Sequence, residues 1–197
     1  MAAPFDGQTA LVVVDVQNDF VDPSGSLVVP GAAAAIPAVN REVERAAAAG
    51  ALVVYTRDRH PAHTPHFAQD GGTWPVHCVQ GTWGAELHPG LVVVPSARVV
   101  DKGTGGEDGY SAFSQRSPAG GERASTGLEE MLRQAGVRRV VVIGFATDYC
   151  VKETVLDALG LGFEVTVVRD AVRAVDLAPG DGERALDELR RAGCQLA

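Results

Sequence analysis

The sequence predicts a three-layer α/β/α fold built on a mainly parallel sheet of roughly six strands. Short runs of valine, isoleucine and other apolar residues recur along the chain, and each run is too short to form a helix. Segments with helical apolar spacing lie between the runs, and a glycine follows each of them. Strands that alternate with helices favour a parallel sheet covered on both faces, because each right-handed crossover carries a helix across the sheet.

Five apolar runs are expected to form the sheet, and the C-terminal end supplies a short sixth strand. The strongest runs are continuous rather than alternating, which is typical of strands that are buried on both faces. The predicted strands cover residues 10–14, 51–55, 98–100, 140–143 and 163–168, with a stub at 195–196.

Four helices are expected between these strands and near the C-terminal end. Pro37 lies in the first turn of the first predicted helix, where a missing backbone N–H is tolerated. Thr126 and Glu129 have the spacing of a capping box, and Asp181 is expected to cap the last helix. The predicted helices cover residues 36–49, the segment from Thr126 to Gly136, residues 148–159, and the segment from Asp181 to Gly193.

Length, charge and cysteine content narrow the class of protein. The length fits one domain over residues 1–197, and a chain of this size needs no disulfide or metal to fold. The net charge of −8 argues against a nucleic-acid partner, and no apolar run approaches the ~20 residues of a membrane span. The N-terminal residues lack the pattern of a secretory signal, and the three cysteines indicate a reducing compartment, so we expect a cytoplasmic protein. A homo-oligomer remains open.

Ionisable or nucleophilic residues follow four of the predicted strands. Asp15, Asp58 and Lys102 come directly after or near the ends of the first three strands. The fourth strand leads into a turn that ends at Cys150. Because the carboxyl ends of parallel strands open onto one edge of a sheet, these four side chains are candidates for a single site.

Cys150 is the candidate nucleophile. It is expected in the opening turn of a helix, where unpaired amides and the helix dipole would stabilise a thiolate and lower the pKa of the thiol. The amides of the same turn could also hold an oxyanion. Cys78 and Cys194 lack such a position and are interpreted as small buried apolar residues.

Asp15 and Lys102 are the candidate proton acceptor and its cationic partner. No histidine follows a strand closely enough to suggest a Cys-His pair. A carboxylate can take the proton of a thiol if a cation orients it and balances its charge. The spacing is equally compatible with a buried ion pair that only supports the sheet.

The stretch from residue 57 to 95 predicts a metal site. It contains Asp58 and four histidines within eighteen residues, at His60, His63, His66 and His77. Imidazole and carboxylate ligands together suit Zn²⁺, Fe²⁺ or Mn²⁺, and three ligands would leave positions open for catalysis. Solvated loop histidines are the weaker alternative. A second long stretch, 103–125, has no regular pattern, and whether it acts as a lid stays open.

Five motifs together resemble the nicotinamidases (pyrazinamidases), a branch of the isochorismatase-like cysteine hydrolases. The resemblance runs from about residue 10 to 170. Asp-x-His with Trp-Pro-x-His-Cys is similar to the metal-containing branch in particular. The motifs are Val14-Asp15-Val16-Gln17-Asn18-Asp19-Phe20, Asp58-x-His60, Trp74-Pro75-Val76-His77-Cys78, Lys102-Gly103, and Gly144-Phe145-Ala146-Thr147-Asp148-Tyr149-Cys150-Val151.

The resemblance implies a role for Cys150 and for the residues expected beside it. Cys150 would attack the carboxamide of nicotinamide, and Asp15 would take its proton and pass it to the leaving ammonia. Lys102 would keep Asp15 ionised, and the amides of Ala146 and Cys150 would form the oxyanion hole. The family also has a cis peptide at the position of Phe145–Ala146.

The resemblance further implies a metal cofactor and an aromatic binding pocket. Asp58, His60 and His77 would hold a divalent metal that binds the pyridine nitrogen directly or through water, and His66 is a fourth ligand in some members. Zinc is expected, with iron or manganese as alternatives. Ala68 stands where a serine is common. The residues expected to enclose the ring of the small aromatic amide are Phe20, Trp74 and Tyr110.

Two other functions remain open at this point. Metal-free relatives hydrolyse carbamoyl or ureido compounds or isochorismate, although they would not need the Asp58, His60 and His77 set. A non-catalytic scaffold with a structural metal is the third reading, although structural zinc sites are usually closed and rich in cysteine. The leading hypothesis is a metal-dependent nicotinamide amidohydrolase that serves NAD salvage and also accepts pyrazinamide.

Overall fold

The predicted α/β/α architecture is confirmed. The computed structural model describes residues 5–106, 108–116 and 123–197. Six strands form one sheet in the order β3-β2-β1-β6-β7-β8, and every neighbouring pair is parallel. The strands are β1 (Thr9–Val14), β2 (Leu52–Asp58), β3 (Arg98–Lys102), β6 (Arg139–Phe145), β7 (Glu164–Arg173) and β8 (Gln195–Leu196). A separate antiparallel pair joins β4 (Ser114–Gln115) and β5 (Ala124–Ser125).

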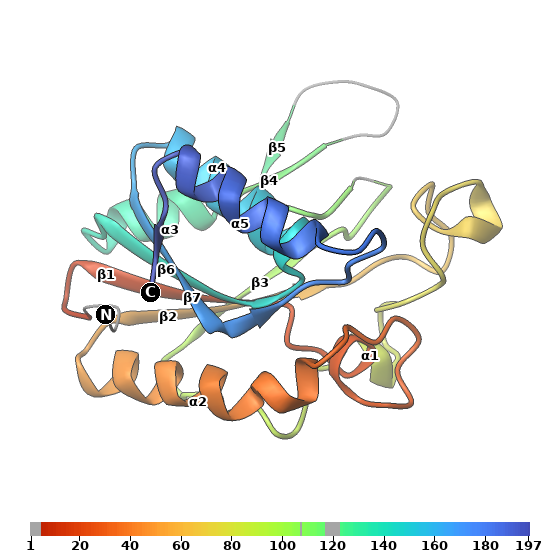
Figure 1. Cartoon of the computed structure of the whole chain (residues 1–197), viewed down its shortest axis with the longest axis horizontal. Helices are drawn as coiled ribbons and strands as arrows, with labels where there is room; N and C mark the ends of the chain where they lie inside the picture. The colour runs from red at the N-terminus through yellow and green to blue at the C-terminus, as the bar shows by residue number, and fades with distance from the viewer. Residues whose placement is uncertain (1–4, 107, 117–122) are drawn as a thin grey trace.

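Helices cover both faces of the sheet, as Figure 1 shows. On one face lies α2 (Ala32–Ala48), and on the other lie α3 (Leu128–Gln134), α4 (Lys152–Gly160) and α5 (Asp181–Arg191). Within the described residues, none of these helices combines the length and apolar character that a bilayer span requires.

The apolar run of β1 is continuous because both faces of this strand are buried. Leu11 and Val13 pack into the cluster on the α2 side, whereas Val12 and Val14 pack into the cluster on the side of α3, α4 and α5. Successive side chains of a strand point to opposite faces, so a central parallel strand must be apolar at every position. Burial of each such valine contributes about 1.5–3 kcal/mol before the entropic cost of folding.

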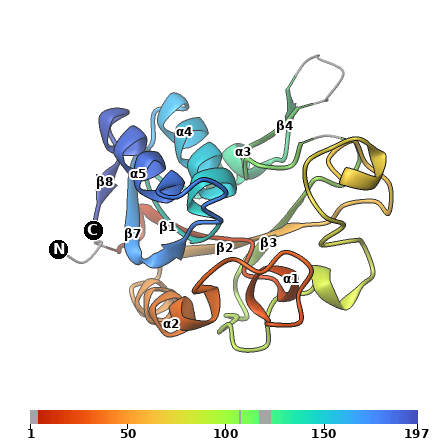
Figure 2. The same ribbon diagram turned by 45° about the vertical axis from the view of Figure 1, so that its right-hand side comes forward.

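The loops that carry polar motifs gather beyond the carboxyl ends of the strands (Figure 2). They include α1 (Asn18–Val21) and the short helices η1 (Ala68–Asp70) and η2 (Trp83–Ala85). This edge is where the predicted site residues were expected to meet.

Helix α2 begins four residues before its predicted start, so Pro37 lies beyond the first turn. The preceding alanines favour a helix but give no apolar periodicity, which hides them from a pattern search. Strand β7 extends past the predicted residue 168 to Arg173. Its polar residues Arg169 and Asp170 are exposed and interrupt the apolar run that predicted the strand.

Two predicted helix caps are wrong. Gly127 caps α3 with a positive φ of 86°, and Thr126 instead accepts the Leu128 N–H and donates its hydroxyl to Ala112 O. Gly180 caps α5 with a φ of 85°. Glycine enters this left-handed backbone region without the steric cost of a side chain.

Candidate active site

Side chains that follow four neighbouring strands meet at the carboxyl edge of the sheet. The ammonium of Lys102, at the end of β3, lies 2.6 Å from Asp15 Oδ2 and 3.6 Å from Cys150 Sγ. It also contacts the carboxylate of Asp58, at the end of β2. One carboxylate oxygen from each aspartate and Cys150 Sγ lie within 4.8 Å of one another. The structure therefore brings a thiol, a cation and two acids into one buried cluster.

Neighbouring strands hold the Asp15 carboxylate in place. Thr56 on β2 donates its hydroxyl to Asp15 Oδ1 at 2.6 Å, and the same hydroxyl oxygen accepts the Asp15 N–H at 3.2 Å. Gly144 on β6 permits the strands to approach closely here, because a Cβ at this position would collide with the backbone of Val14. The sheet thus orients the acid before any substrate arrives.

Burial and the charge of Lys102 set the pKa values of Asp15 and Cys150. Burial raises the pKa of Asp15 to about 6, although the charge of Lys102 opposes this effect. Burial also raises the pKa of the Cys150 thiol well above its ordinary value, again with Lys102 opposing. The expectation that a helix N-terminus lowers the pKa of this thiol is therefore wrong, since the thiol is buried beside two carboxylates. At neutral pH a thiol faces an ionised carboxylate that can accept its proton.

The turn that carries Cys150 differs from the expected helix start. The Phe145–Ala146 peptide is cis, as the resemblance implies. Thr147–Val151 form one π-helical turn, and α4 begins only after it. Asp148 anchors this turn, because its carboxylate accepts two backbone amides after β7 at 3.0 and 2.9 Å.

Asp58, His60 and His77 form a second cluster, which could hold a metal ion. Their ligand atoms lie within 4.8 Å of one another, and all three side chains are buried. Nδ1 of His60 meets the carbonyl of Gly103 at 3.1 Å, and Nδ1 of His77 meets that of Pro75 at 2.7 Å. A carbonyl can only accept, so Nδ1 carries the proton in each ring and Nε2 keeps its lone pair for a cation.

The protonation states of this cluster suit a metal. Burial lowers the pKa of His60 to about 4 and also lowers that of His77, although Asp58 opposes both shifts. Burial acts to raise the pKa of Asp58, but Lys102 and the two imidazoles hold it below its usual value. Neutral imidazoles and an ionised carboxylate are the forms that bind Zn²⁺, Fe²⁺ or Mn²⁺. The residues present therefore fit a divalent transition metal.

The remaining histidines of the loop separate into two groups. His66 lines a cavity that His60 and His77 also line, and its ring centroid lies 5.5 Å from that of His60. Its Nε2 is buried and has no hydrogen-bond partner among the described residues, although His66 lies outside the three-residue group. His63 is 79% exposed and contacts Asp70, so the structure does not bring it to the site. His88 lies in a turn, where it accepts a backbone N–H.

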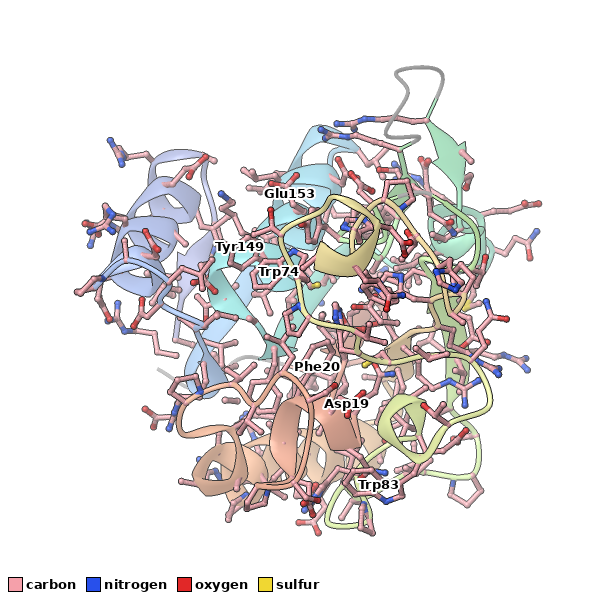
Figure 3. The ribbon with its side chains drawn as sticks, turned by 90° about the vertical axis from the view of Figure 1, so that its right-hand side faces the viewer. Asp19, Phe20, Trp74, Trp83, Tyr149 and Glu153 are labelled. Carbon is pink, nitrogen blue, oxygen red and sulfur yellow. The ribbon has the colours of Figure 1, made fainter. Side chains whose placement is uncertain are left out.

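A cavity beside both clusters has a largely aromatic wall. Phe20, Trp74 and Tyr110 line it, together with Cys150. His60, His66 and His77 line it as well. Trp74 donates its indole N–H to Tyr110 Oη at 2.9 Å and packs edge-on against Tyr149, with ring centroids 4.8 Å apart. Figure 3 shows Trp74 beside Tyr149, with Phe20 below them. The aromatic wall of the cavity therefore lies next to the thiol.

Sequence reasoning assigned no role to two residues that support the site. Tyr149 lines the cavity wall beside Trp74. Gln17 is fully buried, donates to Asp58 O at 2.8 Å, and accepts the Asp58 N–H at 2.8 Å. A buried amide paired with the backbone of Asp58 fixes the direction of that carboxylate. The only signal in the sequence is a polar residue three positions after the end of a strand that is buried on both faces.

Comparisons with known sequences agree with this geometry. A model of the isochorismatase domain matches residues 9–197. The nicotinamidase of Escherichia coli (strain K12) is 39% identical over 203 residues, covering 95% of this chain and 93% of that protein. The nicotinamidase/pyrazinamidase of Mycobacterium tuberculosis (strain ATCC 25618 / H37Rv) is 38% identical over 192 residues, covering 95% of this chain and 97% of that protein.

Solved structures share the fold over nearly the whole chain. The pyrazinamidase of Pyrococcus horikoshii in complex with zinc has a TM-score of 0.86 at 41% identity, covering 96% of this chain and 98% of that one. PnC1 from L. infantum in complex with nicotinate has a TM-score of 0.89 at 36% identity, covering 100% of this chain and 96% of that one. The fold, the arrangement of the strand-end residues and the extent of the match together show that this chain belongs to the isochorismatase domain family.

Proposed function

We propose that this protein is a metal-dependent amidohydrolase that converts nicotinamide to nicotinic acid and ammonia, and that it also hydrolyses pyrazinamide. The observation that carries the proposal is the meeting of two clusters at one cavity. The first cluster, called the thiol cluster, contains Cys150, Asp15, Lys102 and Asp58, and the second contains Asp58, His60 and His77. Cys150, His60 and His77 line the same aromatic pocket. A carboxamide on a flat nitrogen heterocycle suits this pocket, because the carboxamide would meet Cys150 and the ring nitrogen would lie toward His60 and His77.

Formation of a thioester is the first half of the proposed reaction. Asp15 takes the proton of the Cys150 thiol as the sulfur attacks the carboxamide carbon. The N–H groups of Ala146 and Cys150 stabilise the oxyanion that develops on the carboxamide oxygen. Asp15 then gives the proton to the departing nitrogen, the C–N bond breaks, and ammonia leaves an acyl group on Cys150.

Hydrolysis of that thioester is the second half. Asp15 accepts a proton from the incoming water as the water oxygen attacks the acyl carbon. The C–S bond then breaks to release the acid, and Asp15 returns the proton to the Cys150 sulfur, which restores the thiol and the ionised carboxylate. Lys102 supports both halves, because its charge lies 2.6 Å from Asp15 Oδ2 and favours the ionised carboxylate between steps.

The second cluster supplies the cofactor site in this proposal. Asp58, His60 and His77 would hold the metal, with His66 as a fourth ligand, and zinc is the expected ion. When bound, the metal would hold the ring nitrogen of the substrate directly or through water. Phe20, Trp74 and Tyr110 would enclose the ring itself, because all three line the cavity beside Cys150.

The reaction would return nicotinamide to NAD synthesis in the cytoplasm. All three cysteines are free thiols, which suits a reducing compartment. The metal-free alternative, hydrolysis of a carbamoyl compound or isochorismate, gives no use to the buried neutral imidazoles of His60 and His77, so the aromatic amide is favoured.

An ammonia-release assay with and without a chelator tests the proposal. The purified protein should release one ammonia and one nicotinate for each nicotinamide consumed, and removal of the metal should stop the reaction until zinc, iron or manganese is restored. Pyrazinamide should also react. Absence of ammonia from both amides in the metal-loaded protein would refute the assignment, and undiminished activity after complete metal removal would favour the metal-free alternative.

A further inference from the structure

The segment from Gly109 to Arg116 forms one side of the active site. The carbonyl of Gly109 accepts a hydrogen bond from Lys102 Nζ at 2.6 Å. The next residue, Tyr110, accepts the indole N–H of Trp74 and lines the cavity. This short piece of chain therefore touches both the thiol cluster and the aromatic wall.

The carboxylate of Asp157 on α4 accepts several hydrogen bonds from the same part of the chain. Ser111 and Ser114 both donate their hydroxyls to Asp157 Oδ2, at 2.7 and 2.6 Å. Arg123, which directly precedes β5, donates to Asp157 Oδ1 at 2.9 Å. Hydrogen bonds to an ionised acceptor are stronger than those between neutral groups, so three donors on one carboxylate make a firm anchor.

The hydrogen bonds around Asp157 are more buried than the surface ion pairs of the protein. The side chain of Asp157 is 12% exposed, and Ser111 is 5% exposed. One helical turn earlier, Thr154 is fully buried and accepts the Ala112 N–H at 3.0 Å. By contrast, Arg116 and Glu153 form only a long, partly exposed contact of 3.7 Å. Asp157 and Thr154 thus carry the attachment of the segment to the helix.

Helix α4 also follows directly from the turn that holds Cys150. The anchor and the candidate nucleophile therefore belong to one continuous stretch of helical backbone. These hydrogen bonds therefore restrain movement of the Tyr110 segment relative to Cys150.

We propose that Asp157 is a positioning residue, which fixes Tyr110 and the aromatic wall relative to Cys150 and so sets how tightly the substrate ring is bound. The statement about substrate rests on the proposed function, whereas the statement about Tyr110 and Trp74 does not. Asp157 acts through Ser111 and Ser114 and does not itself line the cavity.

Fluorescence of Trp74 tests the proposal without any substrate. The chain has two tryptophans, so the Trp83→Phe background leaves Trp74 as the reporter. Trp74 is only 6% exposed and donates to Tyr110. Asp157→Ala should shift its emission to longer wavelength and increase quenching by acrylamide, while far-ultraviolet circular dichroism stays unchanged. Tyr110→Phe, which removes the hydrogen bond alone, serves as the positive control.

Steady-state kinetics supply the second readout. Asp157→Ala should raise KM for nicotinamide about ten-fold and lower kcat less than about three-fold, because the ring is held less firmly while the thiol cluster is intact. Asp187→Ala is the matched control, since Asp187 is an exposed helical aspartate paired with Arg190. It should leave both the fluorescence and the kinetics unchanged.

Partial variants cover the case in which Asp157→Ala fails to fold. Asp157→Asn keeps one acceptor oxygen and should give a smaller change, and Ser111→Ala with Ser114→Ala should reproduce the fluorescence shift. Unchanged Trp74 emission in these folded variants would overturn the proposal, as would a fall in kcat with KM unaltered. If the wild-type protein has no amidase activity but Asp157→Ala still shifts the Trp74 emission, the positioning role stands and the proposed function is refuted.

Discussion

The ammonium of Lys102 lies 2.6 Å from a carboxylate oxygen of Asp15, and neither side chain is exposed to solvent. Lys102 also contacts Asp58, so one buried cation serves two buried acids. Burial of charge is costly unless it is paired, and the loss of one partner leaves the others uncompensated. Stability and proposed catalysis therefore depend on the same three side chains.

Replacement of Lys102 should destabilise the fold. Lys102→Met leaves Asp15 and Asp58 buried without a cation, and we expect it to lower the free energy of unfolding by about 3–5 kcal/mol. Urea denaturation of the metal-free protein measures this change. Adding Asp15→Asn to Lys102→Met should recover part of the loss. Arg190→Ala, which breaks only an exposed pair, is the control, and an equal loss in both variants would contradict the account.

Activity should fall in mild acid. The proposed base must be ionised, and burial raises the pKa of Asp15 to about 6. A base is lost as pH falls through its pKa, so kcat/KM should be level near neutrality and drop about ten-fold per pH unit well below that value. A profile measured with excess zinc separates this effect from loss of metal. A profile that stays level down to an ordinary carboxyl pKa of about 4 would show that Asp15 is not the base.

Loss of one imidazole should reduce metal content. His77→Ala removes a buried neutral ligand and leaves Asp58 and His60, and we expect metal to fall well below one ion per chain after dialysis. Elemental analysis of the purified protein measures it directly. His88→Ala should retain the metal of the wild type, because His88 lies in a turn away from the cluster. Equal metal in both variants would exclude His77 as a ligand.

The pairing of Gln17 with the backbone of Asp58 should matter for metal affinity. Gln17→Leu keeps a side chain of similar size but removes both hydrogen bonds to Asp58. Loss of a residue that orients a ligand typically costs about 10–100-fold in metal affinity. Competition with a chromophoric chelator measures this affinity, and Gln69→Leu is an exposed control. An unchanged affinity in Gln17→Leu would mean that Asp58 needs no such support.

Much of the site could be predicted because it is built on strand ends. Asp15 and Asp58 follow or end apolar runs that form buried strands, and Lys102 ends a shorter run that forms an edge strand. Parallel strands bring their carboxyl ends together at one edge of the sheet. The order of the strands was not needed for that inference. The same logic identified the turn before Cys150, whose position after β6 follows from the run at 140–143.

Loop paths and local electrostatics were beyond the reach of sequence patterns. His63 and His66 lie three residues apart in the same loop, yet one is exposed and the other lines the cavity. The pKa of Cys150 depends on how deeply the turn is buried and on the carboxylates that face it. Asp157 accepts hydrogen bonds from two serines that lie more than 40 positions earlier in the chain, and no local pattern predicts such a contact.

Intact-mass analysis of acid-quenched reactions tests the central claim most directly. During turnover of nicotinamide, a fraction of the protein should carry one nicotinoyl group, and peptide mapping should place that group on Cys150. Cys150→Ala should show neither the adduct nor ammonia release, whereas Cys194→Ala should show both. Turnover that persists in Cys150→Ala, or an acyl group found on another residue, would contradict the account.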